Sequence, residues 1–277
     1  KVLESEGMNG ISLRGLAEAT GVSKTAPYRH FTDKRDLLVS LAAEGVRTII
    51  HSAQGDLAIS SPLIGRFNLY NVLAAVAATM ALGVPAGFIR DGIAGLTGVP
   101  GRLQRISLRG EPAVFVDYAH TPDALLRVLQ NLVELRRGRI ITVFGCGGNR
   151  DRGKRPLMGS AATAYSDVTI ITSDNPRGED PRQIISEIEK GVDVKSVRKL
   201  SPEEISAAGG DKYYVLLPDR QKAIELAVRL AGPGDTILIA GKGHEDYQIV
   251  GKERFPFDDR LVAREALDVR RNNELRY

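Results

Sequence analysis

The sequence is poor in residues that several classes of protein require. Its 277 residues include no tryptophan, 5% aromatic residues and a single cysteine, Cys146. One cysteine cannot form an internal disulfide, which excludes a disulfide-stapled secreted domain and favours a reducing compartment. With so few aromatic residues, we do not expect a surface that reads nucleic-acid bases by repeated stacking.

A long hydrophobic run and a strong charge of one sign are also missing. The longest apolar stretch, residues 72–84, is shorter than the ~20 residues that cross a bilayer. The net charge of +4 neither requires nor excludes nucleic acid. No signal-peptide hydrophobic segment follows Lys1, so we expect a cytoplasmic protein without a membrane partner. Because the chain begins without methionine, we expect a fragment or a processed product.

Three compact motifs for nucleotides or metals are absent. The glycine-rich stretch 145–151 lacks the third glycine of a dinucleotide fingerprint, because Arg150 stands there. None of the Gly-Lys pairs is followed by Ser or Thr, so the sequence has no Walker A P-loop. His244 and Glu245 lack the H-E-x-x-H spacing of a zinc site, and we expect this chain to supply no metal site.

Short helices separated by tight turns are predicted for the first 50 residues. Leu13, Leu16 and Ala17 recur at helical spacing, Gly21 ends that helix, and a second short helix spans residues 24–30. The small Ala17 and the turn glycine fit a helix-turn-helix. The segment therefore predicts a small all-α helix-turn-helix.

The string ISLRGLAEATGVSKTAPYRHFTDKRDLL resembles the DNA-binding domain of TetR-type repressors. The resemblance implies a recognition helix over residues 24–30 and DNA as a partner. Its implied DNA-contacting residues are Thr25, Ala26, Tyr28, His30 and Lys34. The alternative is a small three-helix domain in which Tyr28 and Phe31 are core residues.

From about residue 55 onward, apolar strands alternate with helices of ~10–15 residues. The predicted strands are 113–116, 140–144, 168–172, 213–217 and 236–240, with a hairpin around Gly251. The predicted helices are 67–83, 122–136, 155–165, 181–190 and 221–230. Continuous apolar strands that alternate with helices predict an α/β fold with a mostly parallel, Rossmann-like sheet covered on both faces.

Polar clusters follow four of the predicted strands. They lie at residues 117–122, 145–151, 173–177 and 241–246. In sheets of this type, ligands bind at the carboxyl ends of the strands. We therefore expect the four clusters to form one polar site at one edge of the sheet.

Six stretches between residues 61 and 267 resemble the C-terminal part of the Mur ligase family, in the branch that adds meso-diaminopimelate. They are GRFNLYNVLAA, GRLQRI, VDYAHTPDAL, FGCGGNRDRGKRPLMG, SDNPR and AGKGHEDYQ. The resemblance implies ATP-dependent amide formation through an acyl phosphate in peptidoglycan synthesis, with Mg²⁺. The implied substrates are meso-diaminopimelate and the UDP-N-acetylmuramoyl-dipeptide.

The same resemblance implies an amino-acid pocket at the DNPR motif, which begins at Asp174. An arginine fork matches a carboxylate, whereas a glutamate binds an ammonium group. The implied ligands of the distal carboxylate are Arg177, Asn175 and Arg150, and those of the distal amino group are Gly241 and Glu245. Asp174 is implied to bind the substrate as well. The alternative for Arg177 is a structural ion pair with Asp174 or Glu179.

Nucleotide contacts are also implied by the resemblance. Asn68 and Asn71 lie three residues apart, which puts both amides on one helix face towards adenine, unless one of them caps the helix. Arg102 resembles a hinge arginine that reaches the ATP phosphates, and is implied to be catalytic.

Asp117 and His120 resemble residues that meet nucleotide when the domains close, with Tyr118 beside them, and are implied to be catalytic too. Their alternative is a capped helix start in which Asp117 and Thr121 accept from free N–H groups. Lys154 and Arg155 have two open interpretations: they contact the substrate or they brace the helix.

The chain departs from this family before residue 55, where the P-loop and the magnesium ligands of the complete enzyme are expected. We therefore predict a helix-turn-helix over residues 1–50, a remnant of the central domain over 55–110 that packs poorly between 55 and 99, and the C-terminal domain over 111–277. The chain alone is expected not to turn over ATP. The alternatives are a transcription regulator with a diaminopimelate-sensing domain, and an artificial join of two genes.

Overall fold

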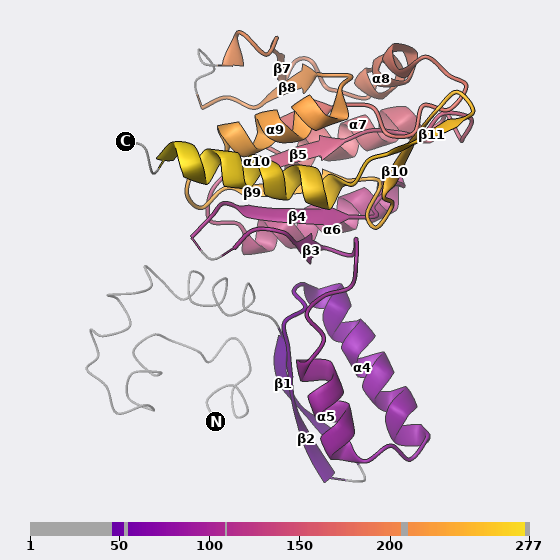
Figure 1. Ribbon diagram of the computed structural model, residues 1–277, viewed down its shortest axis with the longest axis vertical. Helices are drawn as coiled ribbons and strands as arrows, with labels where there is room; N and C mark the ends of the chain where they lie inside the picture. Colours follow the sequence, from indigo (N-terminus) through magenta and orange to yellow (C-terminus); the bar gives the residue numbers. More distant parts are fainter. Residues whose placement is uncertain (1–45, 53–54, 109, 206–209, 275–277) are drawn as a thin grey trace. The chain divides into compact units, whose positions relative to one another are not determined.

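The computed structural model describes residues 46–52, 55–108, 110–205 and 210–274 (Figure 1). The chain divides into two compact units, one that ends at Leu96 and one that begins at Thr97. Each unit is described by itself. The predicted helix-turn-helix lies outside the described residues, and so do its implied DNA contacts, Thr25, Ala26, Tyr28, His30 and Lys34.

The second unit is built on a seven-stranded sheet. Its order is β3-β4-β9-β5-β6-β8-β7, and every pairing is parallel except that of β3 with β4. The strands are β3 (Gln104–Arg105), β4 (Ala113–Asp117), β5 (Ile140–Phe144), β6 (Val168–Ile171), β7 (Arg198–Lys199), β8 (Tyr213–Leu216) and β9 (Thr236–Ala240). The predicted mostly parallel α/β sheet is confirmed.

Helices cover both faces of this sheet. They are α6 (Pro122–Leu135), α7 (Lys154–Tyr165), α8 (Pro181–Glu189), α9 (Arg220–Leu230) and α10 (Asp259–Glu274). Helices α6, α7 and α8 pack side by side, and α9 packs on α10 in front of the sheet (Figure 1). The five predicted strands and the four predicted helices of this unit are confirmed to within about a residue at each end, whereas α10 was not predicted.

Local sequence signals fix where three of these helices begin. The side chains of Thr121, Asp180 and Asp219 accept a hydrogen bond from a backbone N–H in the first turn of α6, α8 and α9. Pro122 and Pro181 occupy first-turn positions, where no backbone donor is needed. The strand-to-helix connections, which carry the polar clusters, therefore end at defined positions.

A buried ion pair joins α9 to α10 beneath the strand ends. Arg220 and Asp259 both have fully buried side chains, and the two lie 2.7 Å apart. The same guanidinium donates to the carbonyl oxygens of Ser173, after β6, and Ala240, at the end of β9. Four segments that are distant in sequence are thus tied to one side chain.

The first unit consists of a hairpin and two helices. Strands β1 (Val46–Ser52) and β2 (Gly55–Ser61) pair antiparallel and are followed by α4 (Arg66–Ala81) and α5 (Ala86–Ala94). The hairpin and α5 were not predicted. The buried residues Leu57, Ile59, Leu63, Val72, Val76 and Ile89 form a small core.

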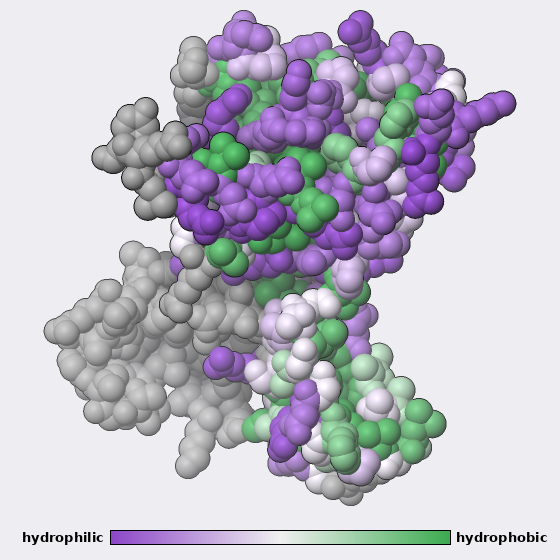
Figure 2. Space-filling model, viewed as in Figure 1, coloured by the Kyte–Doolittle hydropathy of each residue, from purple (hydrophilic) through white to green (hydrophobic). Residues whose placement is uncertain are grey.

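This core corrects the prediction of poor packing for residues 55–99, because β2 buries every second residue against the helices. The unit nevertheless keeps apolar side chains at its surface. Leu82 is 81% exposed and Phe88 is 71% exposed. Figure 2 shows the hydrophobic colour concentrated over the α4–α5 part of this unit, whereas the second unit presents a mostly hydrophilic face.

Removing the guanidinium of Arg220 should destabilise the second unit strongly. The variant Arg220→Met leaves the Asp259 carboxylate buried without its partner, which costs about 3–5 kcal/mol in the free energy of unfolding. Urea denaturation followed by circular dichroism measures this loss. The control Arg127→Met breaks an exposed ion pair with Asp123 and should leave the midpoint unchanged. Equal midpoints for the two variants would contradict the assignment.

Candidate functional site

The four polar clusters meet at one edge of the sheet. They follow β4, β5, β6 and β9, and these strands are direct neighbours in the order β4-β9-β5-β6. All four run parallel, so their carboxyl ends lie together. The predicted polar site at this edge is confirmed in its location.

Asn175 connects three segments at this edge. Its side chain is buried, and its Nδ2 donates to Glu245 Oε2 at 2.8 Å. Its Oδ1 accepts from Lys242 Nζ at 3.0 Å and from the backbone N–H of Ile249 at 2.9 Å. Ile249 belongs to the hairpin of β10 (Tyr247–Val250) and β11 (Glu253–Pro256), which confirms the hairpin predicted around Gly251. Asn175 and Glu245 therefore lie in direct contact, as a shared pocket requires.

The guanidinium of Arg177 has no carboxylate partner in the described part of the chain. Its Nη1 donates to the carbonyl oxygens of Gly148 and Asn175 at 3.1 and 3.4 Å. The backbone of Arg177 has a positive φ of 50° and pairs with the hairpin at Ile249 and Gly251. The alternative ion pair with Asp174 or Glu179 is wrong, because Glu179 pairs with another arginine and Asp174 lies beside Lys242.

That other arginine is Arg155, whose side chain is fully buried. Its Nη1 lies 2.8 Å from Glu179 Oε2 and 2.7 Å from Glu187 Oε2. Glu187 is also paired with Arg152. Hydrogen bonds from Arg155 and from the Asn149 N–H lower the pKa of Glu179 to about 2, and those from Arg152 and Arg155 lower the pKa of Glu187 to about 2.

Arg155 therefore braces the glycine-rich loop and α8, which decides between its two predicted roles. Lys154 also binds protein, since its Nζ donates to the carbonyl oxygen of His120 at 2.7 Å. Arg150 is exposed, and its Nη1 donates only to the neighbouring Asn149 carbonyl among the described residues. Among the described residues, no carboxylate is paired with its guanidinium.

Asp174 places a buried carboxyl group beside Asn175 at this edge of the sheet. Its Oδ1 is buried and has no hydrogen-bond partner among the described residues, although Lys242 Nζ lies 3.6 Å away. Burial raises the pKa of Asp174 and lowers that of Lys242. Gly241 lies against the same carboxylate, because a Cβ there would lie 3.3 Å from Asp174 Oδ2.

Lys242 was missed by the sequence reasoning. Its signal is the AGKGHEDYQ stretch, where a lysine directly follows a fully buried strand. Such a lysine needs an acidic partner, and here it has two, since Glu245 Oε2 lies 3.5 Å from Nζ.

A second group of predicted residues surrounds Tyr118 at the end of β4. The guanidinium of Arg102 lies 5.0 Å from the Tyr118 ring centre, and the rings of His120 and His244 lie 4.5 and 5.2 Å away. Gly243 allows this approach, because its φ is +56° and a Cβ there would lie 2.6 Å from Tyr118 Cβ. The structure brings Arg102, Tyr118 and His120 together, with His244 as a fourth member that was not predicted.

Asp117 is buried beneath this group. Its Oδ2 accepts from the Leu103 N–H at 2.6 Å and its Oδ1 from the Ala119 N–H at 2.8 Å. Burial raises its pKa. The alternative of a capped helix start holds for Thr121 but not for Asp117, which anchors residues 101–105 instead.

Asn68 and Asn71 lie in the first unit. Asn68 is buried, donates to the Ile64 carbonyl oxygen at 2.8 Å and accepts from Asn71 at 3.3 Å. They share one face of α4 as predicted. The alternative that one of them caps the helix is wrong, because Gly65 holds that position and α4 has no side-chain cap.

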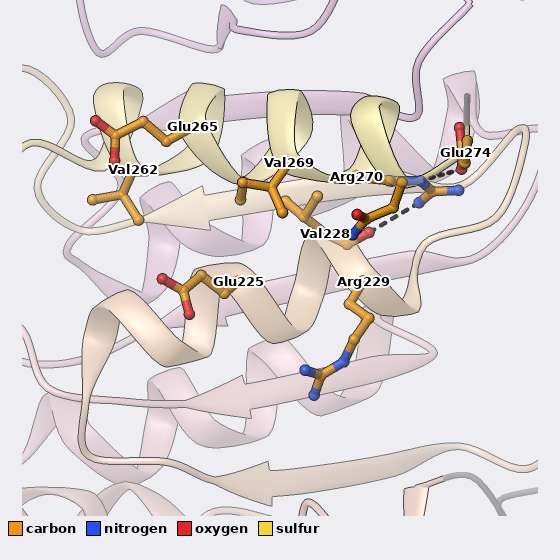
Figure 3. Close-up of a pocket in the computed structure, with 10 residues that line it drawn as sticks. Glu225, Val228, Arg229, Val262, Glu265, Val269, Arg270 and Glu274 are labelled. Atoms are coloured by element: carbon orange, nitrogen blue, oxygen red, sulfur yellow. Dashed lines mark hydrogen bonds and ion pairs between the residues drawn. The ribbon is translucent and has the colours of Figure 1, made fainter. Parts of the chain in front are cut away.

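A groove of about 780 Å³ lies elsewhere, between α9 and α10. Val228, Val262 and Val269 form its apolar lining, and charged side chains surround it (Figure 3). Arg270 already binds Glu274 at 2.8 Å and the Val228 carbonyl at 2.9 Å. The groove lies along the helices and not at the strand ends, so it is separate from the site.

Two protein-family models match parts of the sequence. The family model described as "Mur ligase, glutamate ligase domain" matches residues 101–243, more than half of the chain. The chain belongs to the Mur ligase family. A second model, "Bacterial regulatory proteins, tetR family", matches residues 1–41, which are outside the described residues.

Similar proteins include the UDP-N-acetylmuramoyl-L-alanyl-D-glutamate--2,6-diaminopimelate ligase of Geobacter metallireducens. It is 50% identical over 223 residues, which are 80% of this chain and 44% of that relative. The ligase of the same name from Gloeobacter violaceus is 48% identical over 230 residues, covering 83% and 44%. The chain thus spans less than half the length of these relatives.

A solved structure of a ligase with this name superposes with a TM-score of 0.58 at 40% identity, covering 83% of this chain and 44% of that one. Mycobacterium tuberculosis folylpolyglutamate synthase reaches a TM-score of 0.52 at 23% identity, over 72% and 42%, which shows a shared fold alone. Within the described ranges, no helix is long and apolar enough to cross a membrane. The same residues contain no group of three His, Cys, Asp or Glu placed to hold a metal ion.

The bracing carboxylates should make stability depend on acidity. The pKa of each of Glu179 and Glu187 is lower in the folded chain than the ~4.3 of an unfolded glutamate. Their contribution is therefore complete above about pH 4.5 and is lost as pH falls towards 2. We expect the double variant Glu179→Gln/Glu187→Gln to unfold at a lower temperature at pH 7 and to converge on the parent near pH 2.

Melting temperatures measured between pH 7 and pH 2 provide this comparison. The control Asp123→Asn, which removes an exposed pair with Arg127, should follow the parent throughout. Parallel curves for the parent and the double variant would contradict the bracing role.

Proposed function

We propose that the second unit is the amino-acid-binding part of an ATP-dependent ligase that adds meso-diaminopimelate to UDP-N-acetylmuramoyl-L-alanyl-D-glutamate. One observation carries this proposal. Among the described residues, the guanidinium of Arg177 has no carboxylate partner, and a buried carboxylate oxygen of Asp174 on the same short loop has no hydrogen-bond partner. One end of the site thus offers a positive and a negative group to a zwitterion.

The far end of meso-diaminopimelate carries one carboxylate and one ammonium. The carboxylate is proposed to bind the guanidinium of Arg177, supported by Arg150 at the rim and by the remaining Nδ2 hydrogen of Asn175. The ammonium is proposed to bind Glu245, Asp174 and the backbone of Gly241. Lysine lacks this carboxylate, so its binding would leave the arginine charges unpaired.

Amide formation needs the amine of this amino acid next to an activated carboxyl group. In the proposed reaction, ATP phosphorylates the D-glutamate carboxylate, and the amine attacks the acyl phosphate with loss of phosphate. The residues of this chain hold the amino acid at its far end, which orients the reacting amine. Arg102 and His120, which both lie against the Tyr118 ring, are proposed to contact the nucleotide phosphates. Asp117 is proposed to position Arg102 through the Leu103 backbone.

Adenine is proposed to contact Asn68 and Asn71. Mg²⁺ neutralises phosphate charge in reactions of this type. The described residues do not fit a magnesium site, and the sequence carries no P-loop. The chain is accordingly proposed not to complete the ligation alone. The tetR-family match lies on residues that are not described and supports no proposal of DNA binding.

Isothermal titration of meso-diaminopimelate into the chain tests the pocket. Binding should be detectable without the nucleotide sugar, and L-lysine should bind at least about 100-fold more weakly. Arg177→Gln should weaken meso-diaminopimelate about 10- to 100-fold, because it removes a charged hydrogen bond. The control Arg229→Gln, on α9, should change nothing. Equal affinity for lysine and meso-diaminopimelate, or no binding of either, would contradict the proposal.

A further inference from the structure

Lys242 lies at the centre of a buried charge cluster behind the pocket. Its side chain has no exposed surface, so a substrate cannot reach the ammonium group directly. The Nζ atom lies 3.0 Å from Asn175 Oδ1, 3.5 Å from Glu245 Oε2 and 3.6 Å from Asp174 Oδ1. It also lies 5.6 Å from the centre of the Tyr247 ring. Each of its three polar neighbours belongs to the proposed ligand set.

The first consequence concerns the amide of Asn175. Its oxygen accepts from both Lys242 and the Ile249 N–H, and its nitrogen donates to Glu245. An ammonium group has donors only, so it can face the oxygen of the amide but not the nitrogen. Lys242 is thus one of three groups that hold the amide in this orientation, together with the Ile249 N–H and the Glu245 carboxylate, and one Nδ2 hydrogen remains for a ligand carboxylate.

The second consequence concerns charge. The Lys242 ammonium group lies between two carboxylates, 3.6 Å from Asp174 Oδ1 and 3.5 Å from Glu245 Oε2. The adjacent Arg220 and Asp259 are paired with each other. Removal of Lys242 would leave the two carboxylates opposed without the cation that lies between them.

We propose that Lys242 is a positioning residue that helps to hold the Asn175 amide and lies between the Asp174 and Glu245 carboxylates as their shared counter-charge, at the place where the ammonium end of a diamino acid would bind. This inference rests on the proposed function only for the identity of the ligand. Lys242 acts through these neighbours and does not touch the substrate.

The charged groups that face Asp174 bear on its titration. They lie on α9, on α10 and on the loop after β9, and they are Arg220, Asp259, Lys242 and Glu245. Burial raises the pKa of Asp174, while Arg220 and Lys242 oppose that rise. Loss of Lys242 removes one of these two cations, so Asp174 should take up a proton at a higher pH than in the parent.

The variant Lys242→Met tests this role, since methionine has similar length without the charge. In protein labelled with ¹⁵N-asparagine and free of ligand, the side-chain amide signals of Asn175 should be sharp in the parent and broadened or exchanging in the variant. The Asn175→Ala protein assigns these signals. The same proteins are then titrated with meso-diaminopimelate between pH 5 and pH 8.5.

We expect Lys242→Met to bind meso-diaminopimelate at least about tenfold more weakly at pH 7.5. The pH below which affinity falls should be higher by about one unit or more. The control is Arg139→Met, which breaks the ion pair between Arg139, just before β5, and Asp235, just before β9. This pair lies at the edge of the sheet opposite to the site. The control variant should lower stability without moving the Asn175 signals or the pH profile.

The outcomes separate the two proposals. Unchanged Asn175 signals in Lys242→Met overturn the positioning role, and so does a pH profile equal to that of the parent. If the parent binds no meso-diaminopimelate but the Asn175 signals depend on Lys242, the proposed function fails and the positioning role stands. If the pH profile of the Arg139→Met control shifts as much as that of Lys242→Met, the shift results from a loss of stability, and this overturns the inference.

Discussion

Arg220 and Asp259 meet at 2.7 Å with both side chains fully buried, directly below the carboxyl ends of β6 and β9. An ion pair in this position has an unfavourable desolvation cost that only good geometry offsets. The guanidinium satisfies that condition, because it also donates to two backbone carbonyls. The two strand ends that carry the DNPR and GKGHE loops are thereby held at a fixed separation, and the remaining geometry of the site depends on it.

Charge is distributed over this edge of the sheet in three layers. The deepest layer is the neutral pair of Arg220 and Asp259. Above it, Lys242 separates Asp174 from Glu245, and at the rim the guanidiniums of Arg177 and Arg150 have no carboxylate partner among the described residues. The proposed zwitterionic ligand end would lie between the second and third layers, where each of its charges would meet an opposite one.

Much of this fold could be predicted from the sequence, since strands buried on both faces read as continuous apolar runs. Helix α10 could not, because Ala263 and Leu267 are its only fully buried apolar residues among many charged ones. The β1–β2 hairpin was also not predicted, for a different reason. Its turn carries no strong two-residue signal, and its strands alternate between buried and exposed residues only over β2.

The residues of the site could be named from motifs, but their division of labour could not. Arg155 and Arg177 both follow glycine-rich or proline-containing loops, yet one is fully buried against two carboxylates and the other is not. The position of Lys242 after a buried strand indicates that it needs an acidic partner, but the sequence does not show which carboxylates supply it. The structural residues can be told from the proposed ligand contacts only in three dimensions, where loops that are 70 residues apart in sequence meet, as at Asn175 and Glu245.

A crystal of the chain soaked with meso-diaminopimelate tests the central claim most directly. The account predicts ligand density at the carboxyl ends of β6 and β9, with the distal carboxylate on Arg177 and the distal ammonium between Asp174 and Glu245. Density in the reverse orientation, or density elsewhere such as the α9–α10 groove with this edge of the sheet empty, would contradict it.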